Sequence, residues 1–456
     1  MMSTSYKGTN KLLIGIVLAV LSFWLFAQSM LNIAPDVQKD LSISQGALNI
    51  GISITALFSG LFIVMVGGLA DKVGRVKFVY IGLLLNIVGS FLLTISFESS
   101  LFIIGRAMQG LAAAFIMPAT MALVKTYYEG KDRQRAVSFW SIGSWGGSGF
   151  CSLFGGAVSS SLGWRYVFIM SIIVSVISML LIFGTPESKV NSSTKEKFDF
   201  IGLTIFIVSM LSLNVVISKA KELGIFSPYI LALSLVVVVG LVVFYKVETS
   251  KDNSFIDFSL FKIKVYLGAT ISNFLLNAVA GTLIVINSYM QQGRGMNSRD
   301  AGMMSLGYLV CVLITIRIGE KFLQKFGSRT PMLLGTVITC IGVGLMTLTM
   351  VEGTAYLILV FVGYALFGTG LGIYATPSTD TALSSVPNDK VGSAAGIYKM
   401  ASSLGGAIGV AISAAVYSAL SAGGNFNDGA TYGLIINILF CIFSIISIVV
   451  IIPKKQ

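Results

Sequence analysis

The chain has 456 residues, of which 55% are hydrophobic and only 11% are charged. A soluble domain carries roughly 25% charged residues, so a water-soluble fold is excluded, because it could not bury this much apolar surface. The absence of histidine excludes histidine bases, histidine metal ligands and Ser-His-Asp triads. The four cysteines lie scattered in apolar runs, which predicts neither a zinc site nor a disulfide framework. We expect an all-α polytopic membrane protein that is not an enzyme and needs no cofactor or metal.

Apolar runs long enough to cross ~30 Å of hydrocarbon as helices recur along the whole chain. We predict fourteen transmembrane helices in a 6+2+6 order. A six-helix half (1–190) is followed by two additional helices with their linkers (191–262) and by a second six-helix half (263–456). The predicted helix cores are 12–34, 47–69, 77–97, 100–124, 136–160, 166–185, 200–218, 225–245, 266–290, 301–319, 331–350, 355–378, 393–421 and 430–452.

The distribution of basic residues predicts the orientation in the membrane. With the N-terminus inside, most of the 31 lysine and arginine residues fall in cytoplasmic connections, where basic residues collect in membrane proteins. This asymmetry predicts that both termini are cytoplasmic and that the number of spans is even. The membrane topology then accounts for the net charge of +12, and we expect no nucleic-acid partner.

The two predicted halves repeat a pattern. Segments 67–75 and 321–329 are short basic turns with a glycine between cations, and each follows the second helix of its half. The fifth helix of each half is rich in glycine. Internal repeats with glycine-interrupted helices at matching positions are typical of transporters whose site lies between the halves.

The segment 67–77 resembles the signature loop of the major facilitator superfamily, Gly-x-x-x-Asp-Arg/Lys-x-Gly-Arg-x-Arg/Lys. Its matching residues are Gly67, Asp71, Lys72, Gly74, Arg75 and Lys77. We expect a helix to end near Asp71 and a tight turn at Gly74. The carboxylate would then latch the cytoplasmic side by pairing with a cation or with the N-terminus of a neighbouring helix. The alternative is a plain basic turn.

Arg106 and Gly110, with Gln109 between them, resemble the Arg-x-x-x-Gly motif that the same family carries on its fourth helix. An arginine in hydrocarbon costs ~2.5–3.5 kcal/mol on insertion scales, so Arg106 should face the interior of the bundle. There it would serve as a proton-relay group or line the substrate cavity. The alternative is an arginine that only fixes helix packing.

The fifth helix resembles the antiporter motif of drug/proton exchangers, which ends Gly-Pro-x-x-Gly-Gly. Its residues are Gly143, Gly147, Cys151, Gly155 and Gly156. The sequence departs from the motif because Cys151 and Ser152 stand where Gly-Pro is expected, so a proline bend is not available there. Glycines still permit close helix contacts. These motifs and the fourteen spans together resemble the fourteen-helix drug/proton antiporter branch of the superfamily.

Three further stretches, 23–29, 141–149 and 372–380, are similar to staphylococcal quinolone-efflux pumps of this branch. The resemblance implies proton-driven export of quinolones and other amphipathic or cationic drugs through the bacterial cytoplasmic membrane, and we expect a monomer. No P-loop motif occurs, so ATP is not expected to drive transport from within the chain. The alternatives are an exporter of an endogenous metabolite or lipid-like compound, a non-transporting receptor and a channel.

The acid that carries protons is the open question. The first predicted helix has no acid, and the penultimate one offers Lys399 instead. We expect Asp380 to couple proton movement, because it follows Pro377 and proline loosens a helix. Glu320 is the second candidate, and its position three residues after Arg317 places both on one helix face. A structural ion pair is the favoured alternative for these two.

Polar and aromatic side chains on several predicted helices are candidates for the substrate cavity. Aromatic rings there would stack on planar drugs or hold cations. The alternative for any one ring is packing against lipid or at the membrane interface. The candidates are Phe23, Trp24, Gln28, Gln109, Trp140, Trp145, Tyr374, Tyr398, Lys399 and Arg317.

Overall fold

The computed structural model describes residues 6–43, 45–189, 200–224, 226–250, 257–296, 298–421 and 423–453. This part of the chain is helical and contains no strand, which confirms the predicted all-α class. Twelve of its helices are long and apolar enough to cross a membrane. The predicted spans 136–160 and 200–218 are not among these twelve, although both regions are helical. The count of fourteen is therefore roughly consistent with the structure.

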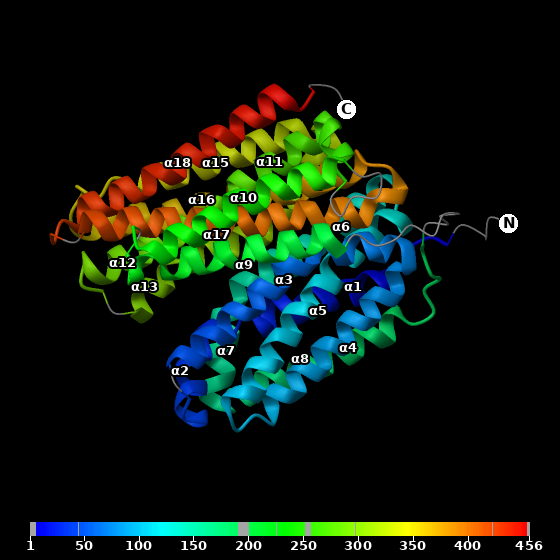
Figure 1. The fold of residues 1–456 in the computed structure, drawn as a ribbon. Coiled ribbons are helices and arrows are strands. Elements are labelled where there is room, and N and C mark those ends of the chain that lie inside the picture. The colour runs from blue at the N-terminus through cyan, green and yellow to red at the C-terminus, as the bar shows by residue number, and fades with distance from the viewer. Residues whose placement is uncertain are drawn as a thin grey trace. The chain divides into compact units, whose positions relative to one another are not determined.

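The described helices fall into two compact units. Unit 1 comprises Met1–Thr126, Cys151–Lys262 and Pro387–Ile397. Within it α4 and α8 pack side by side, and α9 pairs with α10 (Figure 1). Its elements are α1 (Asn10–Leu21), η1 (Ser22–Ala27), α2 (Met30–Leu41), α3 (Gln45–Val73), α4 (Arg75–Thr94), α5 (Ser99–Tyr127), most of α7 (Gly147–Ser161), α8 (Arg165–Ile182), α9 (Phe200–Leu223), α10 (Pro228–Thr249), η3 (Phe258–Lys262), η4 (Asn388–Lys390) and the start of α17 (Val391–Ser421).

Unit 2 comprises Tyr127–Phe150, Ile263–Val386 and Tyr398–Gln456. Here α16 packs along both α14 and α15, and α6 contacts α14 and α16. The domain boundaries that the sequence analysis placed at residues 190 and 262 stay a prediction. The elements of unit 2 are α6 (Gly130–Ser141), η2 (Ile142–Gly146), α11 (Lys264–Ala278), α12 (Gly281–Gln292), α13 (Ser298–Met304), α14 (Leu306–Phe326), α15 (Arg329–Met346), α16 (Gly353–Ser384), the rest of α17 and α18 (Phe426–Ile451).

Two of the predicted continuous helices contain a π-helical turn. The predicted helix 12–34 passes from α1 into η1, where the amide of Gln28 donates to the carbonyl of Phe23 at 3.1 Å. The predicted helix 136–160 is divided by η2 into α6 and α7. A π turn widens the helix and leaves nearby carbonyls without their usual partner. Both interruptions lie in segments that the sequence analysis assigned to function.

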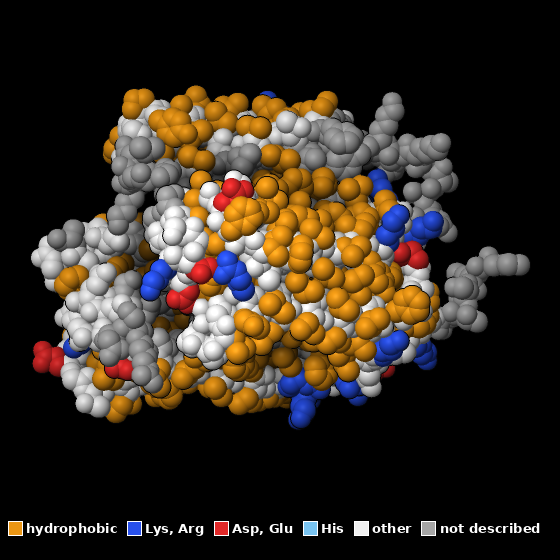
Figure 2. All heavy atoms as spheres, turned by 90° about the horizontal axis from the view of Figure 1, so that it is seen from below, with side chains coloured by type: hydrophobic (Ala, Val, Ile, Leu, Met, Phe, Trp, Pro, Cys, Tyr) orange, Lys and Arg blue, Asp and Glu red, His pale blue; other side chains and the backbone are white. Residues whose placement is uncertain are grey.

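Large apolar side chains remain exposed on the outer faces of the helices. On α4 and α8 they include Leu84, Val88, Phe91, Ile173 and Leu180. Figure 2 shows a broad field of hydrophobic side chains on one face, with most charged side chains at its margins. A water-soluble surface would not expose so much contiguous apolar area, so this face suits the hydrocarbon of a bilayer.

Candidate functional site

The turn between α3 and α4 is built on a glycine. Gly74 has φ 142° and ψ 127°, a conformation that favours glycine. A Cβ here would also lie 2.6 Å from the carboxyl carbon of Glu187, so this carboxylate would have to move to make room for it. The Glu187 carboxylate accepts hydrogen bonds from the amides of Val76 and Lys77, both at 2.9 Å. Glu187 therefore caps the N-terminus of α4, and the sequence analysis missed it.

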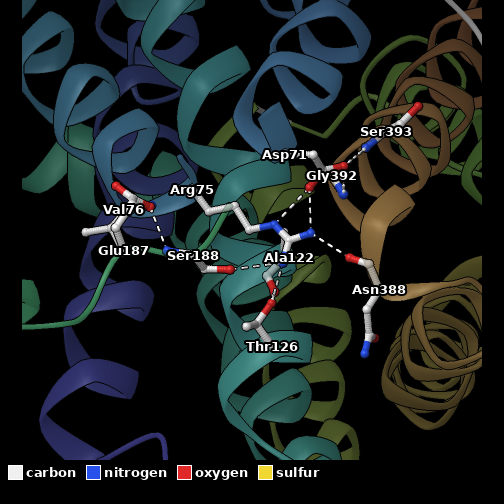
Figure 3. Close-up of polar contacts among 10 residues, drawn as sticks. All are labelled: Asp71, Arg75, Val76, Ala122, Thr126, Glu187, Ser188, Asn388, Gly392 and Ser393. Carbon is white, nitrogen blue, oxygen red and sulfur yellow. Dashed lines mark hydrogen bonds and ion pairs between the residues drawn. The ribbon is translucent and has the colours of Figure 1, made fainter. Parts of the chain in front are cut away.

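Asp71 binds two groups at once, as Figure 3 shows. Its Oδ1 accepts from Arg75 Nε at 2.8 Å and pairs with Nη2 at 2.7 Å. Its Oδ2 accepts from the amides of Gly392 and Ser393, at 2.7 Å and 3.1 Å, in the first turn of α17. The carboxylate is buried. Both partners that the sequence predicted for it, a cation and a helix N-terminus, are present.

Arg75 extends the hydrogen-bond network of Asp71 to three more segments (Figure 3). Its Nη1 donates to Thr126 Oγ1 at 2.5 Å and to Ser188 Oγ at 3.2 Å, and its Nη2 donates to the carbonyl of Asn388 at 2.8 Å. One buried guanidinium thus joins the ends of α3 and α5, the chain after α8 and the segment before α17. Lys72 is exposed beside it.

A close backbone contact explains the first glycine of the motif. A Cβ at Gly67 would lie 2.3 Å from the carbonyl oxygen of Gly392. A Cβ at Gly392 would lie equally close to the carbonyl oxygen of Gly67 and 2.6 Å from Asp71 Oδ1. The α3 and α17 backbones therefore meet where neither residue can carry a side chain. This contact brings the amides of α17 within reach of Asp71.

Arg106 is 1% exposed and is held by neutral oxygens. Its Nε donates to the carbonyl of Gly51 at 3.1 Å, and its Nη1 donates to the carbonyl of Ala27 at 2.8 Å and to Gln109 Oε1 at 2.7 Å. Ala27 ends η1, so its carbonyl lies at the break before α2. The amide of Gln109 in turn donates to Ser90 Oγ at 3.2 Å. The π turn thus supplies an acceptor to a buried guanidinium.

Asp380 pairs with an arginine that lies between two of the predicted helices, 100–124 and 136–160. Arg133, in the first turn of α6, donates from Nε to Asp380 Oδ1 at 2.8 Å. The carboxylate is buried near the end of α16, whereas the Arg133 side chain is 21% exposed. Pro377 lies inside α16 without ending it. Because 247 positions separate the partners, no local pattern could have identified this pair.

Arg317 and Glu320 form the predicted ion pair on α14. Gln324 also donates to Glu320, at 3.2 Å. The Arg317 guanidinium lies 4.8 Å from the ring centroid of Phe139 on α6. Among the described residues of this unit, the pairs Arg133–Asp380 and Arg317–Glu320 both involve α6, one directly and one through an aromatic ring.

Several cavity candidates meet inside unit 2. Ser378 Oγ bonds to the hydroxyls of Tyr374 at 2.9 Å and Tyr398 at 2.8 Å, and all three side chains are buried. The neighbouring Lys399 places its Nζ 4.5 Å from the ring centroid of Trp140 on α6. Hydroxyl bonds thus join α16 to α17, and a cation–π contact joins α17 to α6.

The other candidates are distributed over both units. Phe23 and Trp24 pack edge to face on η1, with ring centroids 5.2 Å apart. Gln28 and Trp145 are half-buried, and Trp145 packs against the core of unit 2. Within the antiporter-like motif, Gly143 and Gly147 are buried, the Cys151 carbonyl accepts from Ser29 Oγ at 2.9 Å, Gly155 lies against Ser29, and Gly156 is exposed. Roles in substrate binding stay predictions for all of these residues.

Comparison with known proteins agrees with this architecture. The family model described as Major Facilitator Superfamily matches residues 12–410 and 268–456. The quinolone resistance protein NorB of Staphylococcus aureus strain MRSA252 is 54% identical over 452 residues, which cover 99% of this chain and 98% of that protein. NorB of strain COL shows the same identity and coverage.

Solved structures share the fold at low sequence identity. A double tryptophan mutant of XylE superposes with a TM-score of 0.68 at 14% identity, covering 97% of this chain and 95% of that one. A bacterial homologue of the iron transporter ferroportin, in its outward-facing state, gives a TM-score of 0.63 at 11% identity, covering 96% and 98%. Because the family model matches most of the chain and NorB is 54% identical over 99% of it, the chain belongs to the Major Facilitator Superfamily of membrane transporters.

Proposed function

We propose that this chain exports quinolones and other amphipathic drugs across the bacterial cytoplasmic membrane in exchange for protons, as a monomer with both termini in the cytoplasm. The observation that carries the proposal is the 54% identity to a quinolone resistance protein over 99% of the chain. The positive-inside distribution of lysine and arginine supports the orientation.

The latch at Asp71 is proposed to gate the cytoplasmic side. Asp71 holds the first amides of α17 at 2.7 Å and 3.1 Å. Alternating access needs contacts that form in one state and break in the other. A carboxylate that binds two N–H donors and Arg75 gives such a contact a defined geometry. Opening this side would require these bonds to break together.

Asp380 is proposed to carry the exchanged proton. Protonation would remove its negative charge and release Arg133, to which it bonds at 2.8 Å. Because Arg133 lies in the first turn of α6, this release would loosen the contact of α6 with α16. Glu320 is the second candidate, since it holds Arg317, whose guanidinium contacts Phe139 on the same helix. The attachments of α6 would thus respond to protonation of either acid.

Drug uptake into everted membrane vesicles tests the transport proposal. With an imposed interior-acid gradient, we expect a fluorescent quinolone to accumulate in the vesicles. This accumulation should be lost when a protonophore is added. In de-energised vesicles, the addition of ATP should not change the uptake. Uptake that needs ATP would refute the exchange. Downhill flux insensitive to the proton gradient would indicate a channel.

Asp380→Asn tests the coupling residue. We expect it to abolish proton-driven accumulation while part of the drug binding remains, and Asp380→Glu to keep part of the activity, because only a titratable side chain can exchange a proton. Asp389→Asn is the matched control, since Asp389 is exposed in the following connection. Normal pumping by Asp380→Asn, together with a block by Glu320→Gln, would assign coupling to the Glu320 pair.

A further inference from the structure

We propose that Asp257 and Lys390 are positioning residues for the latch at Asp71, and that η3 fixes the start of α17 through this ion pair. This role deepens the proposed function and rests on it. The helices α9 and α10 would then take part in gating, because the chain that follows them leads into η3.

The ion pair joins η3 to η4, two segments that are distant in the chain. The Nζ of Lys390 lies 2.5 Å from Asp257 Oδ2 and donates to Ser259 Oγ at 3.1 Å. The other carboxylate oxygen of Asp257, Oδ1, accepts from the amide of Ser259 at 2.9 Å. The local turn therefore orients Asp257, and two side chains of one short segment hold a single ammonium group.

The segment that carries Asp257 is itself attached to α10. The ring of Phe258 packs edge to face on the ring of Tyr245 near the end of α10, with ring centroids 5.4 Å apart. Leu260 is fully buried, and its amide donates to the carbonyl of Asp257 at 3.1 Å. Because its aromatic and aliphatic side chains are packed in this way, η3 can act as a fixed support for a charged partner.

The segment 388–393 is held on both sides of Lys390 by the residues of the latch. The carbonyl of Asn388 accepts from Arg75 at 2.8 Å. The amides at positions 392 and 393 donate to Asp71 at 2.7 Å and 3.1 Å (Figure 3). Lys390 lies between these contacts, and η4 also packs on α3, which carries Asp71. Holding Lys390 in place therefore limits the movement of both contacts of the latch.

The expected effect of this support is on the entropy of closing. The first amides of a helix have no partner within the helix, so those of α17 reach Asp71 only when the segment before them is placed correctly. A segment that is already held loses less conformational freedom when the bonds form. The side chains of Lys390 and Asp257 are 37% and 28% exposed, and exposed ion pairs are weak. The support should therefore favour the closed latch by up to about fivefold.

Asp257→Asn tests this role by hydrogen exchange on the purified full-length protein. Asparagine keeps an oxygen for the amide of Ser259 and loses the charge that binds Lys390. The change is remote in sequence from segment 388–396, so the intrinsic exchange rates of that segment stay the same. We expect its amides to exchange about twofold to fivefold faster. Lys262→Gln is the matched control, because Lys262 is an exposed charge on the same η3 segment, and it should leave this exchange unchanged.

Reversing both charges separates the ion pair from simple packing. Asp257→Lys and Lys390→Asp each bring like charges together, so each alone should accelerate the exchange at least as much as Asp257→Asn. The double variant Asp257→Lys/Lys390→Asp restores opposite charges at the two positions. After correction for intrinsic rates, it should return the exchange in segment 388–396 to within about twofold of the wild type.

Drug–proton exchange in vesicles gives the second measurement. In Asp257→Asn we expect the maximal rate to fall about twofold to fivefold, and KM to change less than about twofold, because the latch acts on gating and not on drug binding. Unchanged amide exchange, an unchanged maximal rate, or acceleration that the double variant does not reverse would overturn this inference alone. A wild type that transports no drug would overturn the proposed function, whatever the amide exchange shows.

Discussion

Replacing Asp71 with asparagine tests the latch with almost no change in volume. The two carboxylate oxygens of Asp71 accept from Arg75 and from the amides of Gly392 and Ser393. Asparagine has one acceptor oxygen and one NH₂ group. In either orientation of the amide, the NH₂ group therefore faces N–H donors, either those of Arg75 or the two amides of α17. Asp71→Asn therefore breaks a buried ion pair and leaves donors unsatisfied, whichever way the amide turns.

The size of the effect follows from burial. Removing one partner of a buried ion pair costs ~3–5 kcal/mol, and both side chains of this pair are at most 5% exposed. At about 1.4 kcal/mol for each factor of ten, the closed latch should become roughly a hundredfold to several thousandfold less favoured. This is large enough to shift a two-state equilibrium from one side to the other.

Hydrogen exchange reports on the contact directly. We expect the amides in the segment 388–396 to exchange faster in Asp71→Asn, and drug–proton exchange in vesicles to fall. Asp389→Asn is the control within that segment, because Asp389 is exposed. Wild-type amide protection together with normal turnover in Asp71→Asn would refute the latch and leave segment 67–77 as a plain basic turn.

Two further predictions use other contacts. Gly67→Ala should lower transport and thermal stability sharply, because its Cβ would lie 2.3 Å from the carbonyl oxygen of Gly392. The matched Gly68→Ala should be tolerated, because no atom lies within 4 Å of a Cβ at that position. Equal transport and equal melting temperatures in the two variants would contradict this prediction. The hydrogen bond from Arg165 lowers the pKa of Asp40, so this pair should stabilise the protein above pH ~4 and lose that contribution as the pH falls further. Because the side chains are 35% and 47% exposed, the effect should stay below about 1 kcal/mol. Melting temperature against pH measures it, and a curve that Asp40→Asn leaves unchanged would refute it.

Local patterns predicted the parts of the site that are local in the chain. Asp71 and Arg75 are four residues apart on neighbouring helices, and Arg317 and Glu320 are three apart on one helix, so spacing alone brought them within reach. Gly74 was identifiable because a turn between two helices needs an unusual backbone conformation. The helical class followed from the length of the apolar runs, which a bilayer requires.

The features that the sequence did not predict depend on the three-dimensional structure, and two of them are contacts between segments that are distant in the chain. Arg133 looked like one of many loop cations, and its pairing with Asp380 across 247 positions arises from the packing of α6 on α16. Glu187 follows α8 and had no motif around it, yet it caps α4. The π turn η1 is as apolar as its neighbours, so hydrophobicity gave no sign of it.

The contact between Gly67 and Gly392 also limits how this protein can evolve. At each glycine the nearest atom that a new side chain would strike is a main-chain oxygen. A side-chain clash can be relieved by trimming a neighbour, but no second substitution shortens a carbonyl. Each position therefore lacks a compensating partner, and a lineage cannot reach new variants there through pairs of mutations. Variants with altered transport should accumulate elsewhere, where neighbouring side chains can change size together.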